Sequence, residues 1–77
     1  MSKKNDPLVS IVIITYNSSK FIFETLESVK LQTYRNIELI VSDDCSSDNT
    51  VEICSNWIEM NRSRFVSTKL ITAPVNT

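Results

Sequence analysis

Apolar residues along the chain form three short, nearly continuous runs, and two stretches with helical spacing separate them. The runs at residues 8–15 and 37–42 are rich in β-branched side chains, which is typical of strands covered on both faces of a parallel sheet. A third run at residues 65–71 includes polar positions, so one face of that strand is expected to be more exposed. Apolar residues at helical spacing predict helices near residues 19–32 and 49–60.

This order of elements predicts part of a doubly wound, Rossmann-like α/β fold with a parallel sheet in the order β-α-β-α-β. Residues 1–7 are polar and end in a proline, and we expect them to form a flexible leader. The chain has 77 residues, about half the length of an ordinary domain. Residues 8–77 are therefore predicted to be an incomplete domain.

Polar residues with helix-capping character precede both predicted helices. Asn49 and Glu52 have the spacing of a capping box at the start of the second helix. The aromatic residues Phe21, Phe23 and Trp57 fall on helical faces, where packing is a more common role than ligand binding. We expect them to pack in the core or at its boundary.

Charge and hydropathy exclude two classes of partner. The net charge is −1, and no basic run is longer than Lys3-Lys4, so the chain lacks the electrostatic footprint of a nucleic-acid-binding protein. Its longest apolar run falls far short of the roughly 20 residues that cross a bilayer. The sequence predicts no nucleic-acid partner and no membrane span in this segment.

Missing residue types exclude several chemistries. The chain has no glycine, so neither a P-loop nor a Rossmann G-x-G-x-x-G motif is encoded. It has no histidine, and its two cysteines, Cys45 and Cys54, are neither a zinc-site pattern nor a disulfide framework. These absences disfavour ATPase, NAD-dependent dehydrogenase and zinc-binding functions, and a reducing cytoplasm is the expected compartment.

Polar residues directly follow the first two predicted strands, at Thr15-Tyr16-Asn17 and at Asp43-Asp44. In open α/β sheets, ligands bind beyond the carboxyl ends of the strands, where these residues would meet. Carboxylates accept hydrogen bonds from base N–H and ribose O–H groups, and an aromatic ring can stack on a base for about 1–3 kcal/mol. The pattern is compatible with a nucleoside site.

A structural interpretation of the same residues is open as well. Aspartates at a strand-to-helix junction, here Asp43, Asp44 and Asp48, commonly serve as helix caps and turn formers. Tyr16 could equally be a boundary aromatic with its hydroxyl in water. Spacing alone does not decide between the two interpretations.

Five segments together carry a family resemblance that none of them would carry alone. They are residues 9–17 (VSIVIITYN), 28–29 (SV), 32–34 (QTY), 37–41 (IELIV) and 43–50 (DDCSSDNT). In order and spacing they closely resemble the opening of the family 2 inverting glycosyltransferases of GT-A fold, over about residues 8–77.

The resemblance implies a site for the donor nucleotide formed by Thr15, Tyr16, Asn17, Asp43 and Asp44. In it Tyr16 packs beside the base, the two aspartates hold base and ribose, and Thr15 supports them through its backbone. Asp44 is the stronger candidate for the base N–H. Where many relatives have glycine, this chain has Cys45, which would stiffen the turn.

The resemblance also implies what these residues lack. The metal-binding D-x-D motif, the catalytic base and the acceptor-binding segment of the family are expected downstream of Thr77, so no catalytic residue or metal ligand is assigned within this chain. The full-length enzyme is expected to use a divalent cation, Mg²⁺ or Mn²⁺, and a nucleotide-sugar donor, with a UDP-sugar favoured. It would transfer the sugar with inversion to a hydroxyl of a glycan or lipid-linked acceptor, in cell-surface polysaccharide or glycoconjugate synthesis, in the cytoplasm or at the inner face of the membrane.

Two other classes fit parts of the pattern. A signalling receiver domain also carries an acidic pair after an apolar strand, but there the pair usually ends the first strand, whereas here a strand and a helix precede Asp43. A non-catalytic α/β binding fragment, in which the aspartates only form caps, is the other alternative. Nucleotide binding by a longer protein would separate it from the enzyme.

Overall fold

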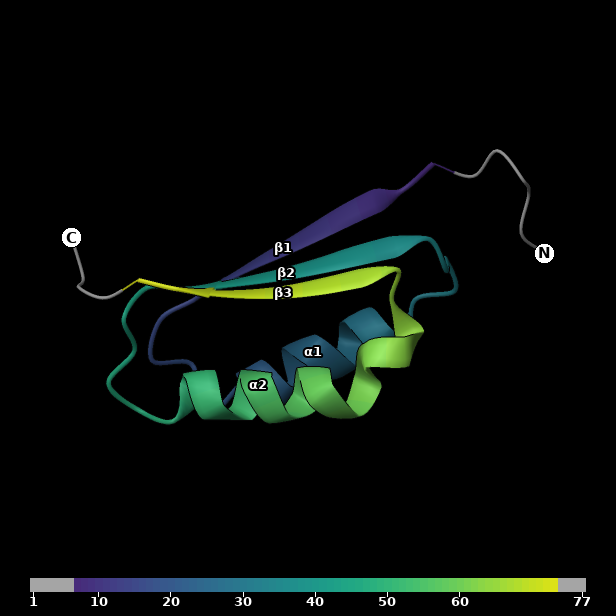
Figure 1. Cartoon of the computed structure of the whole chain (residues 1–77). Coiled ribbons are helices and arrows are strands. Elements are labelled where there is room, and N and C mark those ends of the chain that lie inside the picture. The colour runs from purple at the N-terminus through teal and green to yellow at the C-terminus, as the bar shows by residue number, and fades with distance from the viewer. Residues whose placement is uncertain (1–6, 74–77) are drawn as a thin grey trace.

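The computed structural model describes residues 7–73, which form a three-stranded sheet with two helices packed against it (Figure 1). The elements are β1 (Val9–Thr15), α1 (Ile22–Lys30), β2 (Ile37–Asp43), α2 (Thr50–Asn61), the short 3-10 helix η1 (Arg62–Arg64) and β3 (Ser67–Thr72). The predicted leader at residues 1–7 lies outside the described residues except for Pro7, which is exposed.

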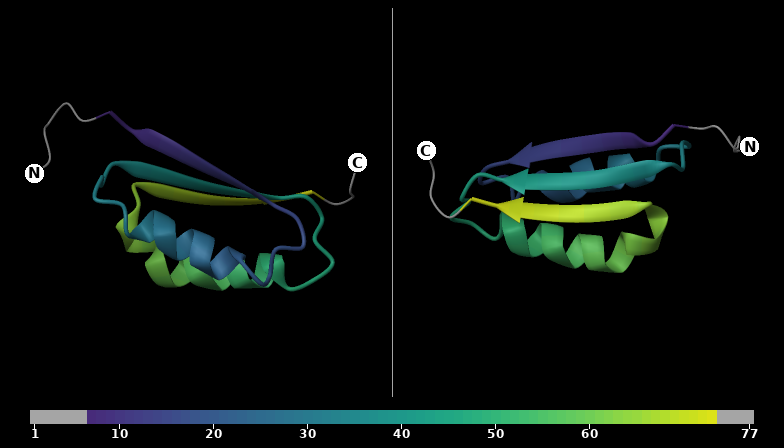
Figure 2. Two further views of the ribbon diagram at one scale, coloured as in Figure 1. Left: turned by 180° about the vertical axis from the view of Figure 1, so that it is seen from behind. Right: turned by 45° about the horizontal axis from the view of Figure 1, so that its top comes forward.

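The sheet has the strand order β1-β2-β3, and both pairs of strands are parallel. Val9 lies beside Ile37, and Glu38 lies beside Ser67, which fixes the register of the two pairs. This arrangement confirms the predicted parallel β-α-β-α-β order. Both helices lie on the same face of the sheet, and the carboxyl ends of all three strands meet at one edge (Figure 2).

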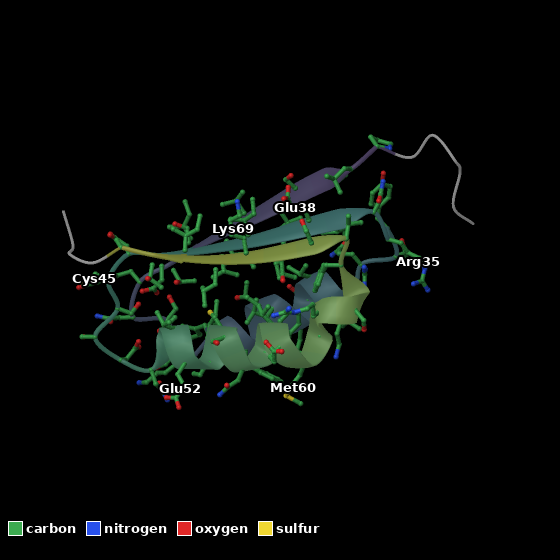
Figure 3. The ribbon with its side chains drawn as sticks, in the orientation of Figure 1. Arg35, Glu38, Cys45, Glu52, Met60 and Lys69 are labelled. Atoms are coloured by element: carbon green, nitrogen blue, oxygen red, sulfur yellow. The ribbon has the colours of Figure 1, made fainter. Side chains whose placement is uncertain are left out.

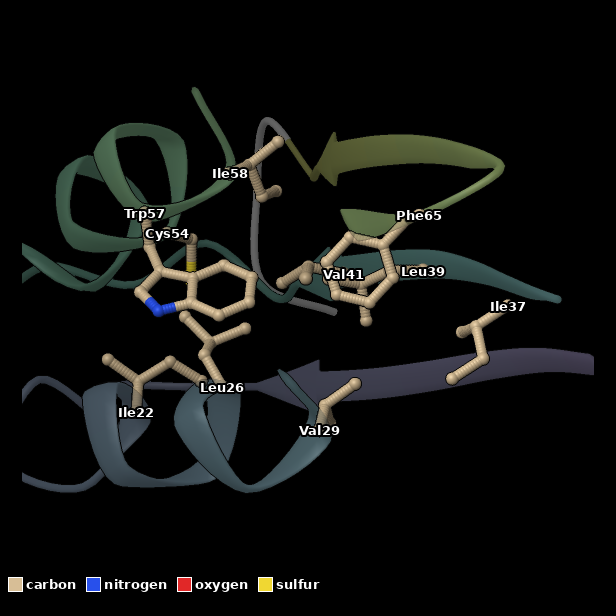
Figure 4. Close-up of a cluster of buried hydrophobic side chains, with 10 residues drawn as sticks. All are labelled: Ile22, Leu26, Val29, Ile37, Leu39, Val41, Cys54, Trp57, Ile58 and Phe65. Carbon is tan, nitrogen blue, oxygen red and sulfur yellow. The ribbon is translucent and has the colours of Figure 1, made fainter. Parts of the chain in front are cut away.

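The core lies between the helices and the inner face of the sheet (Figure 4). Its buried members are Ile22, Leu26, Val29, Ile37, Leu39, Val41, Cys54, Trp57, Ile58 and Phe65. The Trp57 ring packs against Phe65, with a centroid separation of 6.0 Å, and its indole N–H donates to Glu27 at 2.7 Å. The predicted packing role of Trp57 is confirmed.

The helices and β3 begin slightly later than predicted, for local reasons. Ser18 carbonyl oxygen accepts hydrogen bonds from the backbone N–H groups of Phe21 and Ile22, so the chain forms a turn before α1 begins. The predicted capping box at Asn49 is wrong, because Asn49 makes no side-chain cap bond. β3 begins only after η1, since Phe65 first turns into the core.

Two predictions of burial are wrong within the described residues. β1, an edge strand of the sheet, is covered on one face only, because both helices pack on the same face of the sheet. Val12 and Ile14 point away from the helices and are exposed. Phe21 and Phe23 do not pack in the core either, since the α1 face that meets the sheet carries Ile22 instead.

The sheet face that points away from the helices, the open face, carries both polar and apolar side chains. Glu38 and Lys69 project from it (Figure 3). The Glu38 carboxylate accepts hydrogen bonds from Ser10 Oγ on β1 at 2.8 Å and from Ser67 Oγ on β3 at 3.1 Å. These bonds, from Ser10 foremost, lower the pKa of Glu38. In the part of the chain that the structure describes, no helix is long and apolar enough to cross a bilayer.

Candidate functional site

The loops that follow β1 and β2 lie at the carboxyl edge of the sheet and are held together by the backbone. Asp44 N–H donates to the carbonyl oxygen of Thr15 at 2.9 Å, which continues the β1–β2 pairing one residue past the end of β2. The two sequence-predicted tips, residues 15–17 and residues 43–44, are therefore brought together. We call residues 16–21 the first site loop and residues 44–49 the second.

Asp43 lies beneath this edge with its carboxylate turned into the protein. The residue is only 2% exposed, as is Thr15. One carboxylate oxygen, Oδ1, accepts from Thr15 Oγ1 at 2.6 Å and from Ser46 Oγ at 2.6 Å, while Oδ2 accepts from Ser46 N–H at 2.8 Å. Burial raises the pKa of Asp43, but the bonds from Ser46 and Thr15 outweigh it, and the pKa lies below its ordinary value. Asp43 is therefore an ionised acceptor whose oxygens already serve internal donors.

Asn17 connects the first site loop to the second. Its backbone N–H donates to Ser46 Oγ at 2.8 Å, and its side-chain Oδ1 accepts from Ser47 N–H at 2.8 Å and from Ser47 Oγ at 3.3 Å. One residue later, Ser18 N–H donates to Thr50 Oγ1 at 2.8 Å. The partners are about 30 positions apart, so this network fixes the two loops relative to each other.

Asp48 makes a further connection and also caps α2. Its Oδ2 accepts from Ser19 N–H at 3.2 Å, while its Oδ1 accepts from Thr50 N–H at 3.0 Å and from the Thr50 hydroxyl. The hydrogen bond from the Thr50 side chain is the main cause that lowers the pKa of Asp48 to about 2. The cap-forming interpretation therefore holds for Asp48.

Each site loop contains one residue in the left-handed backbone region, where glycine and asparagine are favoured. These residues are Asn17, with φ of 47°, and Cys45, with φ of 59°. Cys45 lies in the loop beyond the carboxyl end of β2 (Figure 3). A glycine would adopt this conformation without cost, whereas a cysteine must be held in it by its surroundings.

Tyr16 and Asp44 differ from their neighbours Thr15 and Asp43 in being accessible. Tyr16 is 53% exposed, Asn17 is exposed as well, and Asp44 is partly exposed. A ligand at this edge would meet an aromatic ring and a carboxylate, which suits a flat heterocycle with an N–H donor. Among residues 7–73, no three His, Cys, Asp or Glu side chains are grouped so that they could hold a metal ion.

The segment 43–50, which carries part of the family resemblance, includes Ser46, Ser47, Asp48 and Thr50, but the sequence did not predict their hydrogen-bond partners. The available signal was the density of Ser, Thr, Asn and Asp in both loops, which is typical of side chains that bond to nearby backbone. That signal gives the kind of contact but not the partner, because the partners lie on the other loop.

Comparison with known proteins places the chain among glycosyltransferases. The sequence model described as glycosyl transferase family 2 matches residues 10–76. Glycosyltransferase GlyG of Streptococcus pneumoniae is 45% identical over 58 residues, which are 74% of this chain and 19% of that protein. The Escherichia coli UDP-Glc:alpha-D-GlcNAc-diphosphoundecaprenol beta-1,3-glucosyltransferase WfaP is 52% identical over 46 residues, 60% of this chain and 18% of that protein.

Solved structures agree with this result. The crystal structure of Staphylococcus aureus TarS 1–349 in complex with UDP matches with a TM-score of 0.73 and 33% identity, covering 91% of this chain and 20% of that one. The chain thus spans about a fifth of the length of the proteins it matches.

Proposed function

Because the chain belongs to glycosyl transferase family 2, we propose that its site loops bind the nucleoside of a nucleotide-sugar donor in a longer glycosyltransferase. In this proposal residues 8–77 are the N-terminal part of a GT-A nucleotide-sugar-binding domain, and Tyr16 and Asp44 contact the ligand directly. The family match decides against the receiver-like alternative.

The orientation of adjacent side chains at the two strand ends carries the proposal. Thr15 and Asp43 point inward and hydrogen-bond to each other, while Tyr16 and Asp44 are accessible at the same edge. The exposed ring can stack on a base, and the Asp44 carboxylate can accept from its N–H. Asn17, exposed beside Tyr16, borders the same site. The UDP complex of TarS supports uracil as the base and a UDP-sugar as the donor.

The acceptor and the stereochemistry belong to the proposed longer protein. We expect transfer to a hydroxyl of a glycan or lipid-linked acceptor with inversion, in cell-surface polysaccharide or glycoconjugate synthesis. The name of the E. coli relative, whose acceptor is a diphosphoundecaprenol-linked sugar, supports an acceptor of this class. Such an acceptor would place the enzyme in the cytoplasm or at the inner face of the membrane.

A divalent cation, Mg²⁺ or Mn²⁺, is expected for the longer enzyme, but the described residues do not fit its site. Asp43 already accepts three hydrogen bonds, and residues 7–73 contain no group of candidate ligands. Its ligands and the catalytic base would have to come from other parts of the protein, and no step of the reaction is assigned to these residues.

The test compares two exposed aromatic residues in the same loop by isothermal titration of the full-length protein with UDP and GDP. Tyr16→Ala should weaken UDP binding by about 5- to 150-fold, the loss of one base stacking worth about 1–3 kcal/mol. Phe21→Ala removes a ring that is 66% exposed and should change the Kd by less than about twofold.

Equal effects of the two substitutions would contradict the assignment of Tyr16, and a wild-type protein that binds neither nucleotide would contradict the proposed function. Sugar release from UDP-sugars then separates the enzyme from the non-catalytic binding alternative, because a binding fragment would bind UDP without turnover.

A further inference from the structure

The Ser46 hydroxyl connects the second site loop to the first site loop and to the end of β2. It accepts a hydrogen bond from Asn17 N–H at 2.8 Å and donates one to Asp43 Oδ1 at 2.6 Å, the same oxygen that Thr15 Oγ1 reaches at 2.6 Å. The chain from Asn17 through Ser46 and Asp43 to Thr15 therefore begins and ends on the β1 side and passes through the end of β2. Consecutive hydrogen bonds of this kind strengthen one another.

Both left-handed residues of the site are next to these bonds. Cys45 directly precedes Ser46, and Asn17 donates to it. Asparagine adopts this region readily, whereas a cysteine in it costs of order 1–3 kcal/mol and persists only where its surroundings hold it. The accessible residues Tyr16 and Asp44 directly precede the two left-handed positions, so their directions depend on the same contacts.

We infer that Ser46 is a positioning residue of the donor site: its hydroxyl fixes the two loops so that the Tyr16 ring meets the face of one base and the Asp44 carboxylate meets the N–H at its edge. The inference rests on the proposed function. Ser46 needs no contact with the nucleotide in this role, because it acts through the backbone of Asn17 and the carboxylate of Asp43.

Ser47 provides a matched comparison. It lies next to Ser46 in the same loop and also bonds to Asn17, but mainly through its backbone N–H, at 2.8 Å against 3.3 Å for the hydroxyl. Alanine keeps that N–H. Ser47→Ala therefore removes only the longer of its two bonds to Asn17 and keeps the connection through the backbone N–H.

The experiment measures UDP affinity, donor KM and kcat in the full-length protein. Ser46→Ala should weaken UDP binding and raise donor KM by about 10-fold, because without these two bonds only about a tenth of the free molecules would hold the loops in the binding arrangement. kcat should stay within about twofold, since the nucleoside is bound alike in the ground and transition states. Ser46→Thr, which keeps the hydroxyl, should restore affinity, and Ser47→Ala should change it by less than about twofold.

Several outcomes would overturn the inference, and a second variant covers the case in which Ser46→Ala does not fold. If Ser46→Ala lowers kcat and the folded fraction while KM is unchanged, Ser46 only stabilises the fold. If Ser46→Ala is too unstable to purify, Ser46→Cys, with a weaker donor and acceptor, must raise KM by about threefold, and an unchanged KM counts against the role. A threonine variant as weak as alanine excludes the hydroxyl as the cause. Wild-type protein that fails to bind UDP removes the proposed function and this inference together.

Discussion

Replacing Asp43 by asparagine is expected to lower stability and replacing Asp44 to lower UDP affinity, although the residues are neighbours with the same side chain. Asp43 is 2% exposed and accepts three internal hydrogen bonds, two at Oδ1 and one at Oδ2. An asparagine oxygen can keep the two hydroxyl donors of Thr15 and Ser46. Its NH₂ group then faces the Ser46 N–H, so a donor meets a donor.

The magnitude follows from that geometry. Asp43→Asn loses one hydrogen bond to a charged group, about 1.5–3 kcal/mol of the free energy of unfolding, and leaves a buried donor unpaired. Asp44→Asn removes the charge from a partly exposed carboxylate and should lower the free energy of unfolding by less than Asp43→Asn does. Its loss appears in ligand binding, where a bond to a charged acceptor is worth about 1.5–3 kcal/mol and the UDP Kd should rise about 10- to 150-fold.

Urea unfolding followed by circular dichroism, with UDP titration of the same preparations, measures both quantities. Asp43→Asn should shift the unfolding midpoint, and Asp44→Asn should shift the Kd. If Asp43→Asn leaves the midpoint unchanged but weakens UDP binding, Asp43 contacts the nucleotide and its internal role is refuted. If Asp44→Asn binds UDP as tightly as the wild type, the direct contact of Asp44 is refuted and Asp44 only forms a cap.

Three further outcomes are expected. The pKa of Asp48 is lowered to about 2 from the ordinary 3.8, so the ionised side chain stabilises the folded state above pH 3.8, and this stability is lost as the pH falls through about 2. Asp48→Asn should flatten the pH dependence of the unfolding midpoint over this interval. An unchanged slope would contradict the role of Asp48. Burial, followed by the charge of Asp43, raises the pKa of Cys54 to about 11, and the residue is fully buried, so iodoacetamide at pH 8 should modify Cys54 only after unfolding in urea. The 77-residue chain prepared alone should associate through its open face. Ile14 is 78% exposed on that face, so Ile14→Lys should reduce the association measured by sedimentation velocity. Equal association of the variant and the wild-type chain would contradict the role of this face.

Much of the fold could be predicted from the chain alone, because hydrophobic spacing is a local property. The β-branched run at residues 37–42 placed β2, and the helical spacing of Ile22, Leu26 and Val29 placed α1. Helix starts were less well predicted. Several polar residues precede α2, and the one whose side chain accepts from the first helical N–H, that of Thr50, is Asp48 rather than Asn49. Asp48 also accepts from the Ser19 N–H on the other loop.

The exposure of β1 could not be predicted from its residues. The β-branched residues Val12 and Ile14 suit a strand that is covered on both faces. Burial depends on where the helices lie, however, and both helices lie on the sheet face opposite to these side chains (Figure 1). A β-branched run indicates that a strand is suited to burial, but it does not indicate which element packs on each face of the strand.

The sequence by itself determined the order of the elements and the positions of the two polar strand ends, since these follow from the period of the apolar residues and from the carboxyl ends of parallel strands meeting at one edge. Only the tertiary structure decided which residue points outward at each strand end, Thr15 or Tyr16 after β1 and Asp43 or Asp44 after β2. Asp43 turns inward because Thr15 and Ser46 converge on it, and Thr15 lies 28 positions away in the sequence. Contacts over such a distance are set by the pairing of β1 with β2, and no local pattern in the sequence records them.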